Sequence, residues 1–342
     1  MERTERGGTA GRQNGRYIIR MRVGRALLIG LFVIALAIAG AYAYYDIKDV
    51  EDRTLDAAAR AEAPGKFVEL ADGATHYQVS GPKNGPVVVF AAGFSVPYYI
   101  WDPLFKTVAD SGFRAIRYDY YGRGWSDRVD ADYTQDLYVR QLDGLLDSLD
   151  VKRPVHLAGL SYGGAIATSF ANRYPERVRS IIYVDATHPG PSAASPRARS
   201  VIGWHRYMVL GGGADQLARG QLDDFFHPEN YPDWVDRYRV TQKFRGTRAA
   251  LRRSQLGIAA GPDQREMLAG IAERKTPVLI LWGREDMIVP FEETDSLRRA
   301  LPHATFVTVD SAGHLPHIEQ ADVVAREVVR FLRRNGGTAG RR

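Results

Sequence analysis

The stretch Gly159-Leu160-Ser161-Tyr162-Gly163 decides the fold because of what lies on either side of it. An apolar run with strand character, residues 154–158, precedes it, and a helical pattern over residues 165–174 follows it. In a strand–turn–helix context, G-x-S-x-G lifts the serine hydroxyl clear of the sheet edge. The glycines remove side chains that would collide in so tight a turn. The stretch therefore predicts a nucleophilic Ser161, against the alternative of a plain glycine-rich turn.

Strand patterns alternate with helical patterns on both sides of this stretch. The predicted strands, recognised as short apolar or alternating runs, are residues 66–70, 75–79, 86–91, 113–118, 154–158, 178–184, 277–281 and 305–309. The predicted core helices are residues 97–110, 133–149, 165–174, 292–301 and 321–333. Alternation of this kind predicts an α/β fold, with a mostly parallel sheet and helices on both of its faces.

One long segment interrupts the alternation. Residues 187–271 are irregularly helical and rich in Arg, Tyr and Trp. We expect them to form a helical cap over one end of the sheet, inserted between the two parts of the core, residues 66–186 and 272–334. A polar, glycine-rich tail, residues 335–342, follows the last helix.

Two further residues complete a candidate catalytic set. A serine hydroxyl is a weak nucleophile at neutral pH and needs a base, which a third group must orient. In a parallel sheet such partners lie beyond the carboxyl ends of the strands. Asp286 follows the strand 277–281, and His314 follows the strand 305–309. Three suitable residues, each placed after a core strand, are a far more specific signal than the serine turn alone.

The chain resembles the α/β-hydrolase fold family over roughly residues 66–334, in which serine, acid and histidine follow one another in this order. The segment 119–126, Asp-Tyr-Tyr-Gly-Arg-Gly-Trp-Ser, is similar to the D-x-x-G-x-G-x-S loop of that family. The segments 283–286 and 313–314 resemble its acid and histidine loops.

This resemblance implies a role for each candidate residue. Ser161 would be the nucleophile, His314 the general base and then the acid, and Asp286 the orienting carboxylate. The backbone N–H groups of Phe94 and Tyr162 would form the oxyanion hole.

The loop that carries Phe94 departs from the family pattern. Family members often have His-Gly here, whereas this chain has Ala91-Ala92-Gly93-Phe94. The donor is a backbone group, so Phe94 can still supply it, but Ala92 leaves open how firmly the loop is held. The loop is also not of the HGGG type, which argues against the hormone-sensitive-lipase branch.

Other acids and histidines offer alternatives. Asp185 ends the strand 178–184, where some lipases place their acid, but Asp286 is favoured. His317 and His188 are more typical of structural or pocket-wall residues than of the base. His76, His156 and His303 are interpreted as packing or surface residues, and Asp119 and Ser126 as residues that hold a loop. The adjacent pairs Asp223-Asp224 and Glu292-Glu293 are interpreted as solvated surface.

Composition excludes several kinds of site. The 342 residues include no cysteine, which excludes disulfides, cysteine nucleophiles and thiolate metal sites. No pattern resembles a metal or cofactor site. The net charge is +6, but residues 1–25 contain seven Arg against Glu2 and Glu5, or +5, which leaves +1 for the rest. A basic tail on a nearly neutral domain gives little support to nucleic-acid binding.

Residues 26–45, ALLIGLFVIALAIAGAYAYY, carry no charge. About 20 apolar residues cross a bilayer as a helix. Arginines precede the segment and acidic residues follow it, so residues 1–25 would be a cytoplasmic tail and the rest extracytoplasmic. We expect a single-pass membrane anchor, joined to the core by a charged linker, residues 46–65. The alternative is a signal peptide cleaved near Ala41-Tyr42-Ala43, which would release a secreted protein.

The sequence thus predicts a membrane-anchored serine hydrolase that cleaves a small-molecule carboxylic ester, or a related acyl bond, through an acyl-enzyme on Ser161. Serine at this position argues against the relatives with an aspartate nucleophile, haloalkane dehalogenases and epoxide hydrolases. The segment 313–319 also resembles the carbon–carbon bond hydrolases of aromatic degradation. Cofactor-free haloperoxidase or perhydrolase activity would use the same residues. A ligand-binding module without turnover and a membrane scaffold are hypotheses from other classes.

Overall fold

The computed structural model of the chain describes residues 9–336. It divides into two compact units, one that ends at Asp49 and one that begins at Val50, and each is described by itself. Residues 1–8 of the predicted basic tail and residues 337–342 of the predicted C-terminal tail lie outside the described residues.

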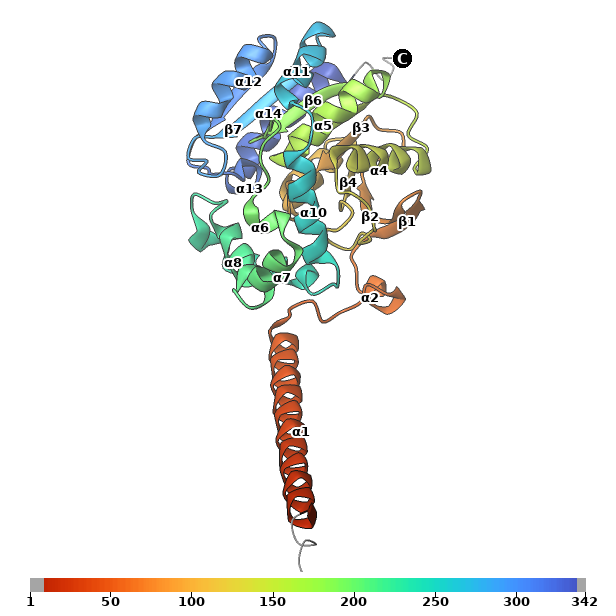
Figure 1. Ribbon diagram of the computed structural model, residues 1–342. Coiled ribbons are helices and arrows are strands. Elements are labelled where there is room, and N and C mark those ends of the chain that lie inside the picture. The colour runs from red at the N-terminus through yellow and green to blue at the C-terminus, as the bar shows by residue number, and fades with distance from the viewer. Residues whose placement is uncertain (1–8, 337–342) are drawn as a thin grey trace, which may run out of the picture. The chain divides into compact units, whose positions relative to one another are not determined.

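The first unit is one long helix, α1 (Thr9–Lys48), drawn in red and orange in Figure 1. Within its segment Gly24–Lys48, a stretch of 18 residues has a mean hydropathy of 2.5, and none of that stretch is buried. The segment is therefore long and apolar enough to be a membrane anchor or a signal sequence. The helix extends past both ends of the predicted span 26–45, because the flanking residues contain no proline to stop it.

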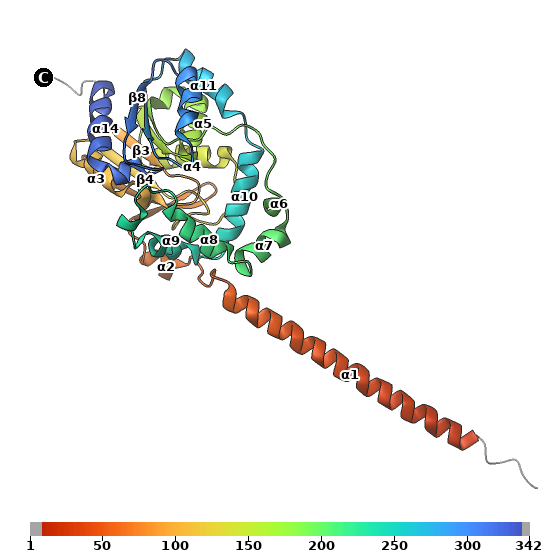
Figure 2. The same ribbon diagram turned by 90° about the vertical axis from the view of Figure 1, so that its left-hand side faces the viewer.

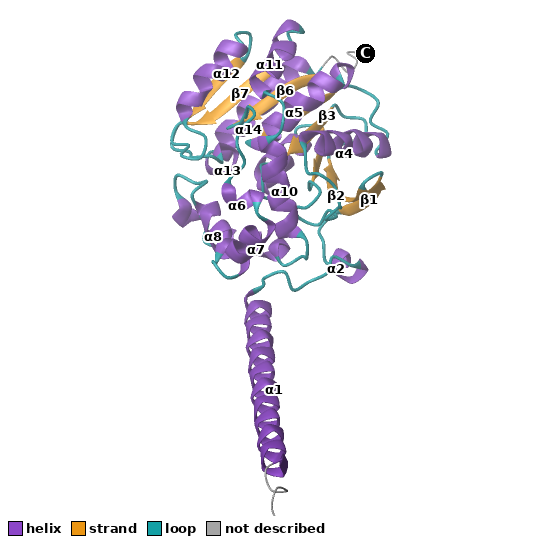
Figure 3. Cartoon of the chain, in the orientation of Figure 1, coloured by secondary structure: helices purple, strands orange, loops and turns teal. Residues whose placement is uncertain are grey.

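The second unit is built on one sheet. Its strands among the described residues are β1 (Lys66–Leu70), β2 (Gly73–Ser80), β3 (Val87–Ala91), β4 (Arg114–Tyr118), β5 (Val155–Leu160), β6 (Val178–Val184), β7 (Val278–Gly283) and β8 (Thr305–Val309) (Figure 3). The order is β1-β2-β4-β3-β5-β6-β7-β8. Pairing is antiparallel from β1 to β4 and parallel from β4 to β8, which confirms the predicted mostly parallel sheet. The carboxyl ends of β3 and β5 to β8 consequently meet at one edge.

Helices cover both faces of this sheet, as the sequence predicted. One face packs against α4 (Gln135–Ser148), α5 (Tyr162–Arg173), α11 (Gln264–Glu273) and α12 (Thr294–Ala300), and the other against α3 (Asp102–Asp110) and α14 (Ala321–Asn335) (Figure 2). Strand β3 shows how the chain supplies both faces. Val87 and Val89 belong to the apolar cluster of α4 and α5, whereas Val88 and Phe90 belong to the cluster of α3 and α14. A strand buried on both faces therefore reads as a continuous apolar run.

A helical insertion lies between β6 and β7. We use this name for α6 (Pro196–Arg199), α7 (Val201–Val209), α8 (Gly213–Arg219), α9 (Trp234–Gln242) and α10 (Thr247–Ala259). The insertion has an apolar cluster of its own, in which Trp204 and Met208 of α7 meet Leu251 of α10. Figures 1 and 2 show α7 and α8 at the end of the unit opposite α11 and α12. Helix α11, which the predicted cap 187–271 includes, packs against α5 and α12 of the core.

The shorter elements lie in connections. They are α2 (Ala57–Ala61), α13 (Pro316–Glu319) and the 3-10 helices η1 (Tyr98–Trp101), η2 (Pro175–Arg177), η3 (Gly220–Leu222), η4 (Pro228–Asn230) and η5 (Phe291–Glu293).

The predicted linker, residues 46–65, is fixed to the second unit from Glu51 onward. The Glu51 carboxylate is buried and accepts hydrogen bonds from the backbone N–H groups of Gly246, at 2.9 Å, and Arg248. Arg53 bridges the backbone of residues 243–245. These groups tie the linker to the start of α10, so it is not a free tether over its whole length.

Candidate active site

Ser161 occupies a strained turn between β5 and α5. Its φ of 51° and ψ of −123° lie in a region that residues other than glycine rarely adopt. The backbone holds it there, because Ser161 N donates to Val184 O at 3.0 Å and Ser161 O accepts from Thr187 N at 3.0 Å. A Cβ atom on Gly163 would lie 2.3 Å from the carbonyl oxygen of Ala91, so the turn requires glycine there. The nucleophile turn predicted from the sequence has the expected strand–turn–helix geometry.

The structure brings His314 and Asp286 into direct contact. His314 Nδ1 lies 2.8 Å from Asp286 Oδ2, and both side chains are buried. Asp286 Oδ1 accepts hydrogen bonds from the N–H groups of Ile288 at 2.8 Å and Val289 at 2.9 Å. These two donors fix the carboxylate, and the carboxylate fixes the Nδ1 edge of the imidazole. Such a pair can orient Nε2 to accept a proton.

Asp185 is a second carboxyl group beside this pair. Ligand atoms of Asp185, Asp286 and His314 all lie within 4.8 Å of one another. Burial raises the pKa of Asp185 well above its usual value, and the adjacent charge of Asp286 raises it further. A hydrogen bond of 2.9 Å from Gly283 N to Asp185 Oδ1 fixes its orientation. Distance alone would allow these groups to hold a cation, but His314 Nδ1 already faces Asp286.

The loop after β3 is held by a residue that the sequence analysis passed over. Arg123 is buried, and its Nε donates to the carbonyl oxygen of Phe94 at 2.7 Å. Its Nη2 donates to Ser254 Oγ of α10 at 2.9 Å. Arg123 therefore holds the loop that carries Phe94, although Ala92 replaces the histidine that family members often have there. The sequence shows a charged residue between two glycines, Gly122-Arg123-Gly124, but it does not reveal that Arg123 contacts Phe94 and Ser254.

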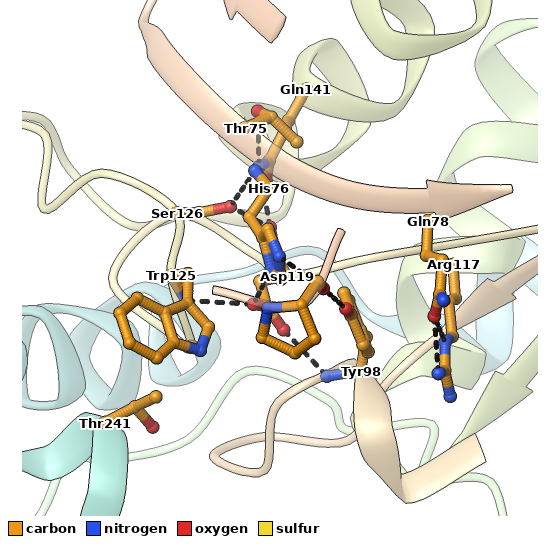
Figure 4. Close-up of polar contacts among 12 residues, drawn as sticks. Thr75, His76, Gln78, Tyr98, Arg117, Asp119, Trp125, Ser126, Gln141 and Thr241 are labelled. Carbon is orange, nitrogen blue, oxygen red and sulfur yellow. Dashed lines mark hydrogen bonds and ion pairs between the residues drawn. The ribbon is translucent and has the colours of Figure 1, made fainter. Parts of the chain in front are cut away.

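The family-like loop 119–126 is organised by Asp119 (Figure 4). The Asp119 carboxylate accepts hydrogen bonds from Tyr98 N at 2.7 Å and Trp125 N at 2.9 Å, and lies 2.7 Å from His76 Nδ1. Ser126 Oγ donates to Asp119 O and accepts from His76 N. The loop-holding role expected for Asp119 and Ser126 matches this geometry, and Arg123 leaves the same loop toward Phe94.

Asp224 also reaches the site, so its interpretation as a solvated surface residue is wrong. A Cβ atom on Gly313 would lie 2.9 Å from Asp224 O and 2.8 Å from Phe226 N, which places this segment against the histidine loop. Burial raises the pKa of Asp224 to about 6, whereas the nearby His314 lowers it. Glu319 ties the two segments together by accepting from Gly313 N at 2.7 Å and Phe226 N at 3.2 Å.

The other histidines near the site are occupied elsewhere. His317 is buried, with Nε2 2.8 Å from the carbonyl oxygen of Ile100, and burial lowers its pKa to about 3. His188 packs against the ring of Tyr183, and burial lowers its pKa to about 4. The structure therefore gives both the structural role expected for them, and only His314 contacts Asp286 within the described residues.

An apolar cavity of about 620 Å³ opens beside the loop after β3. Phe94 forms one wall, and the helical insertion supplies the others through Trp204, Met208, Leu217 and Leu251. Among the aromatic residues of this region, Trp204 lines the cavity, whereas Phe244 packs against Trp125.

The family model described as alpha/beta hydrolase fold matches residues 86–321. The chain belongs to the α/β-hydrolase fold family. The matched segment contains the serine turn, the loop after β3, the helical insertion and the acid and histidine loops of this hydrolase.

Curated relatives match most of this α/β hydrolase. A 2-hydroxy-6-oxononadienedioate/2-hydroxy-6-oxononatrienedioate hydrolase from Burkholderia vietnamiensis is 29% identical over 281 residues, which are 80% of this chain and 96% of the relative. A putative carbamate hydrolase from Pantoea ananatis is 26% identical over 271 residues, which are 76% of this chain and 93% of the relative.

Solved structures give the same family. A thermophilic esterase from Thermogutta terrifontis superposes with a TM-score of 0.68 at 26% identity, covering 80% of this chain and 100% of that one. The enol-lactonase from Burkholderia xenovorans LB400 superposes with a TM-score of 0.67 at 25% identity, covering 78% of this chain and 100% of that one. The relatives are hydrolases of several substrate classes, and the α/β-hydrolase prediction is confirmed.

Proposed function

We propose that this α/β hydrolase uses Ser161 as nucleophile, His314 as general base and then acid, and Asp286 as the orienting carboxylate. The observation that carries the proposal is the strained Ser161 beside β6, together with the buried His314–Asp286 contact beyond β7 and β8 at the same sheet edge. Ser161 Oγ attacks a carbonyl carbon, and His314 Nε2 takes its proton. The N–H groups of Phe94 and Tyr162 bind the oxyanion that forms.

The second half of the reaction returns the enzyme to its starting state. The bond from the carbonyl carbon to the leaving group breaks, and the leaving group takes the proton from His314. Water then attacks the acyl-enzyme, gives its proton to His314, and Ser161 leaves with that proton. One water is consumed, and the products are a carboxylic acid and the protonated leaving group. Asp286 stabilises the imidazolium in both halves.

A carbon–carbon bond beside a ketone is the first candidate for the bond that is cut. Four relatives of 28–29% identity are 2-hydroxy-6-oxononadienedioate hydrolases. The compound so named has a ketone and two carboxylates but no ester, so its hydrolysis breaks a carbon–carbon bond. The ester cleavage expected from the sequence is therefore less well supported than the carbon–carbon alternative named with it.

Ester cleavage remains the second candidate because one specific observation favours it. The esterase from Thermogutta terrifontis superposes on this chain at 26% identity, and the same attack on a carbonyl carbon serves both reactions. Phe94 links the proposed oxyanion hole to the 620 Å³ cavity, whose lining does not include Ser161, Asp286 or His314. The apolar part of its wall supports a substrate with an apolar acyl or ketone substituent in either case. The substrate class is thus a small carbonyl compound with an apolar part.

The apolar segment of α1 is proposed to be an uncleaved membrane anchor. Its 25 residues exceed the length of a typical signal-peptide core. The arginines that precede it support an orientation in which the hydrolase unit lies outside the cytoplasm. Edman sequencing or mass spectrometry of the mature N-terminus tests this, since cleavage after Ala43 would give a secreted protein.

The reaction is tested with the full chain in detergent, comparing wild type with Ser161→Ala. One substrate set is p-nitrophenyl esters from acetate to palmitate, and the other is 2-hydroxy-6-oxodienoates with methyl to long alkyl substituents. We expect turnover of the ketones that the variant abolishes. Turnover of esters alone would select the second candidate. Failure to turn over either set, with no fluorophosphonate labelling of a folded wild type, would contradict the proposal in favour of a binding protein.

A further inference from the structure

The outer face of α7 exposes several apolar residues beside His205 and Arg206. Val201 is 60% exposed and Ile202 75% exposed, and Leu210 at the end of the helix is 44% exposed. The inner face of the same helix is buried through Trp204 and Met208, which line the cavity. One wall of the cavity and this exposed apolar surface are therefore two sides of a single helix.

The charged side chains in the segment that contains this helix have one sign. Residues 187–214 contain Arg197, Arg199 and Arg206 but no Asp or Glu. All three arginines are exposed, and no ion pair involves Arg199 or Arg206 among the described residues. Exposed apolar residues with a rim of exposed arginines are the pattern of a helix that lies in a membrane interface. Anionic lipid headgroups complement such a rim.

Short chain connections join this helix to the end of α1. Only Asp49 and Val50 separate Lys48 from Glu51, and three residues of chain span about 11 Å at most. Glu51 is fixed to the backbone of Arg248, and the carbonyl oxygen of Arg248 accepts a hydrogen bond of 2.8 Å from Trp204 Nε1. Two hydrogen bonds thus connect the membrane-proximal end of the linker to α7.

We infer that the outer face of α7, formed by Val201, Ile202 and Leu210 with the rim of Arg197, Arg199 and Arg206, docks on the lipid bilayer that α1 spans. The inference rests on the proposed anchor. The mouth of the cavity includes Ser195, Pro196 and Arg197 at the start of the same segment. Docking therefore presents the cavity to the bilayer, and the substrate is a carbonyl compound that partitions into lipid.

Absence of cysteine makes a direct test available. Ile202→Cys in the full chain is labelled with a polarity-sensitive fluorophore and reconstituted in nanodiscs that contain anionic and doxyl-labelled lipids. Control labels sit at Ala269→Cys on α11 and at Met287→Cys, an 84% exposed apolar residue elsewhere. We expect quenching at position 202 and not at 269 or 287. Quenching at 287 in place of 202, at all three positions, or at none would overturn the inference.

Kinetics separates this inference from the proposed reaction. The double variant Val201→Ser with Ile202→Ser should keep its activity on a water-soluble substrate within about twofold, and lose about tenfold on a bilayer-borne one, since interfacial binding scales with apolar area. If the double variant lost the same fraction of wild-type activity on both substrates, the result would contradict docking. An inactive wild type would overturn the reaction alone, because the fluorescence needs no turnover. Carbonate extraction of the full chain from membranes would overturn the anchor and the docking together.

Discussion

At the scale of single residues, Asp185 and Asp286 are two neighbouring carboxyl groups with different hydrogen-bond environments. Asp286 accepts two backbone N–H groups and faces His314 Nδ1, an environment that stabilises a negative charge. Asp185 accepts one N–H group, and its other oxygen has no partner among the described residues. Burial raises the pKa of Asp185 well above its usual value and the adjacent charge of Asp286 raises it further, which favours the protonated form of Asp185.

This difference predicts different outcomes for two isosteric changes. Asp286→Asn should slow the reaction of Ser161 with a fluorophosphonate probe by a factor on the order of 10⁴, because it removes the charge that stabilises the imidazolium. Asp185→Asn should change the rate by less than about threefold, because an amide replaces a group that is already neutral. Equal losses would instead make Asp185 the acid. Thermal unfolding of both variants checks that they fold.

Arg123 contacts the site only through the carbonyl oxygen of Phe94, so its replacement should affect catalysis indirectly. Arg123→Gln should lower kcat by about 10- to 100-fold with a smaller change in KM, because misplacing an oxyanion donor by about 1 Å has that cost. Arg128→Gln is the matched control, since Arg128 lies two residues after the loop 119–126 and bonds to Thr247 and to the carbonyl oxygens of Gly124 and Ser126. Equal losses of kcat in both variants would reduce Arg123 to a structural role.

At the scale of elements, the sequence could predict what short-range patterns encode. The strands, the flanking helices and the serine turn follow from apolar spacing and glycine placement within about ten residues. Contacts between distant segments carry no such signal. Arg123 meets Ser254 across 131 positions, and Glu51 meets Gly246 across 195. Two adjacent carboxylates predicted a solvated surface at Asp223 and Asp224, whereas the packing of this segment against Gly313 leaves Asp224 only partly exposed.

Glu51 acts at the start of α10, where free N–H groups and the helix dipole favour a negative charge. Glu51→Gln should lower the free energy of unfolding by about 1–2 kcal/mol, the usual cost of losing a helix cap together with its charge. It should also raise amide exchange in the first turn of α10. Urea unfolding and hydrogen exchange measure the two effects. Glu69→Gln is the control, because that side chain is 77% exposed, and equal effects of both changes would contradict the capping role.

At the scale of the whole molecule, buried titratable groups set how stability depends on pH. Burial lowers the pKa values of His156 and His188 to about 4 and that of His317 to about 3. Between these values and 6.5, the unfolded chain binds protons that the folded chain does not, so these histidines destabilise the fold as pH falls. Asp185 and Asp224 have raised pKa values and act in the opposite sense. The pH dependence of stability is the difference between these two opposing contributions.

His156 isolates one part of this balance, because it lies in β5 away from the catalytic groups and bonds to Ser180 Oγ at 2.7 Å. Its neutral form contributes stability that is fully present above pH 6.5 and is lost as pH falls toward about 4. Between pH 7 and pH 5 the wild type should therefore lose about 2 kcal/mol more than His156→Asn, which cannot titrate. Urea unfolding at the two pH values measures this difference. Parallel pH profiles would show that His156 is protonated in the folded chain, and the acid sensitivity would then belong to His188 and His317.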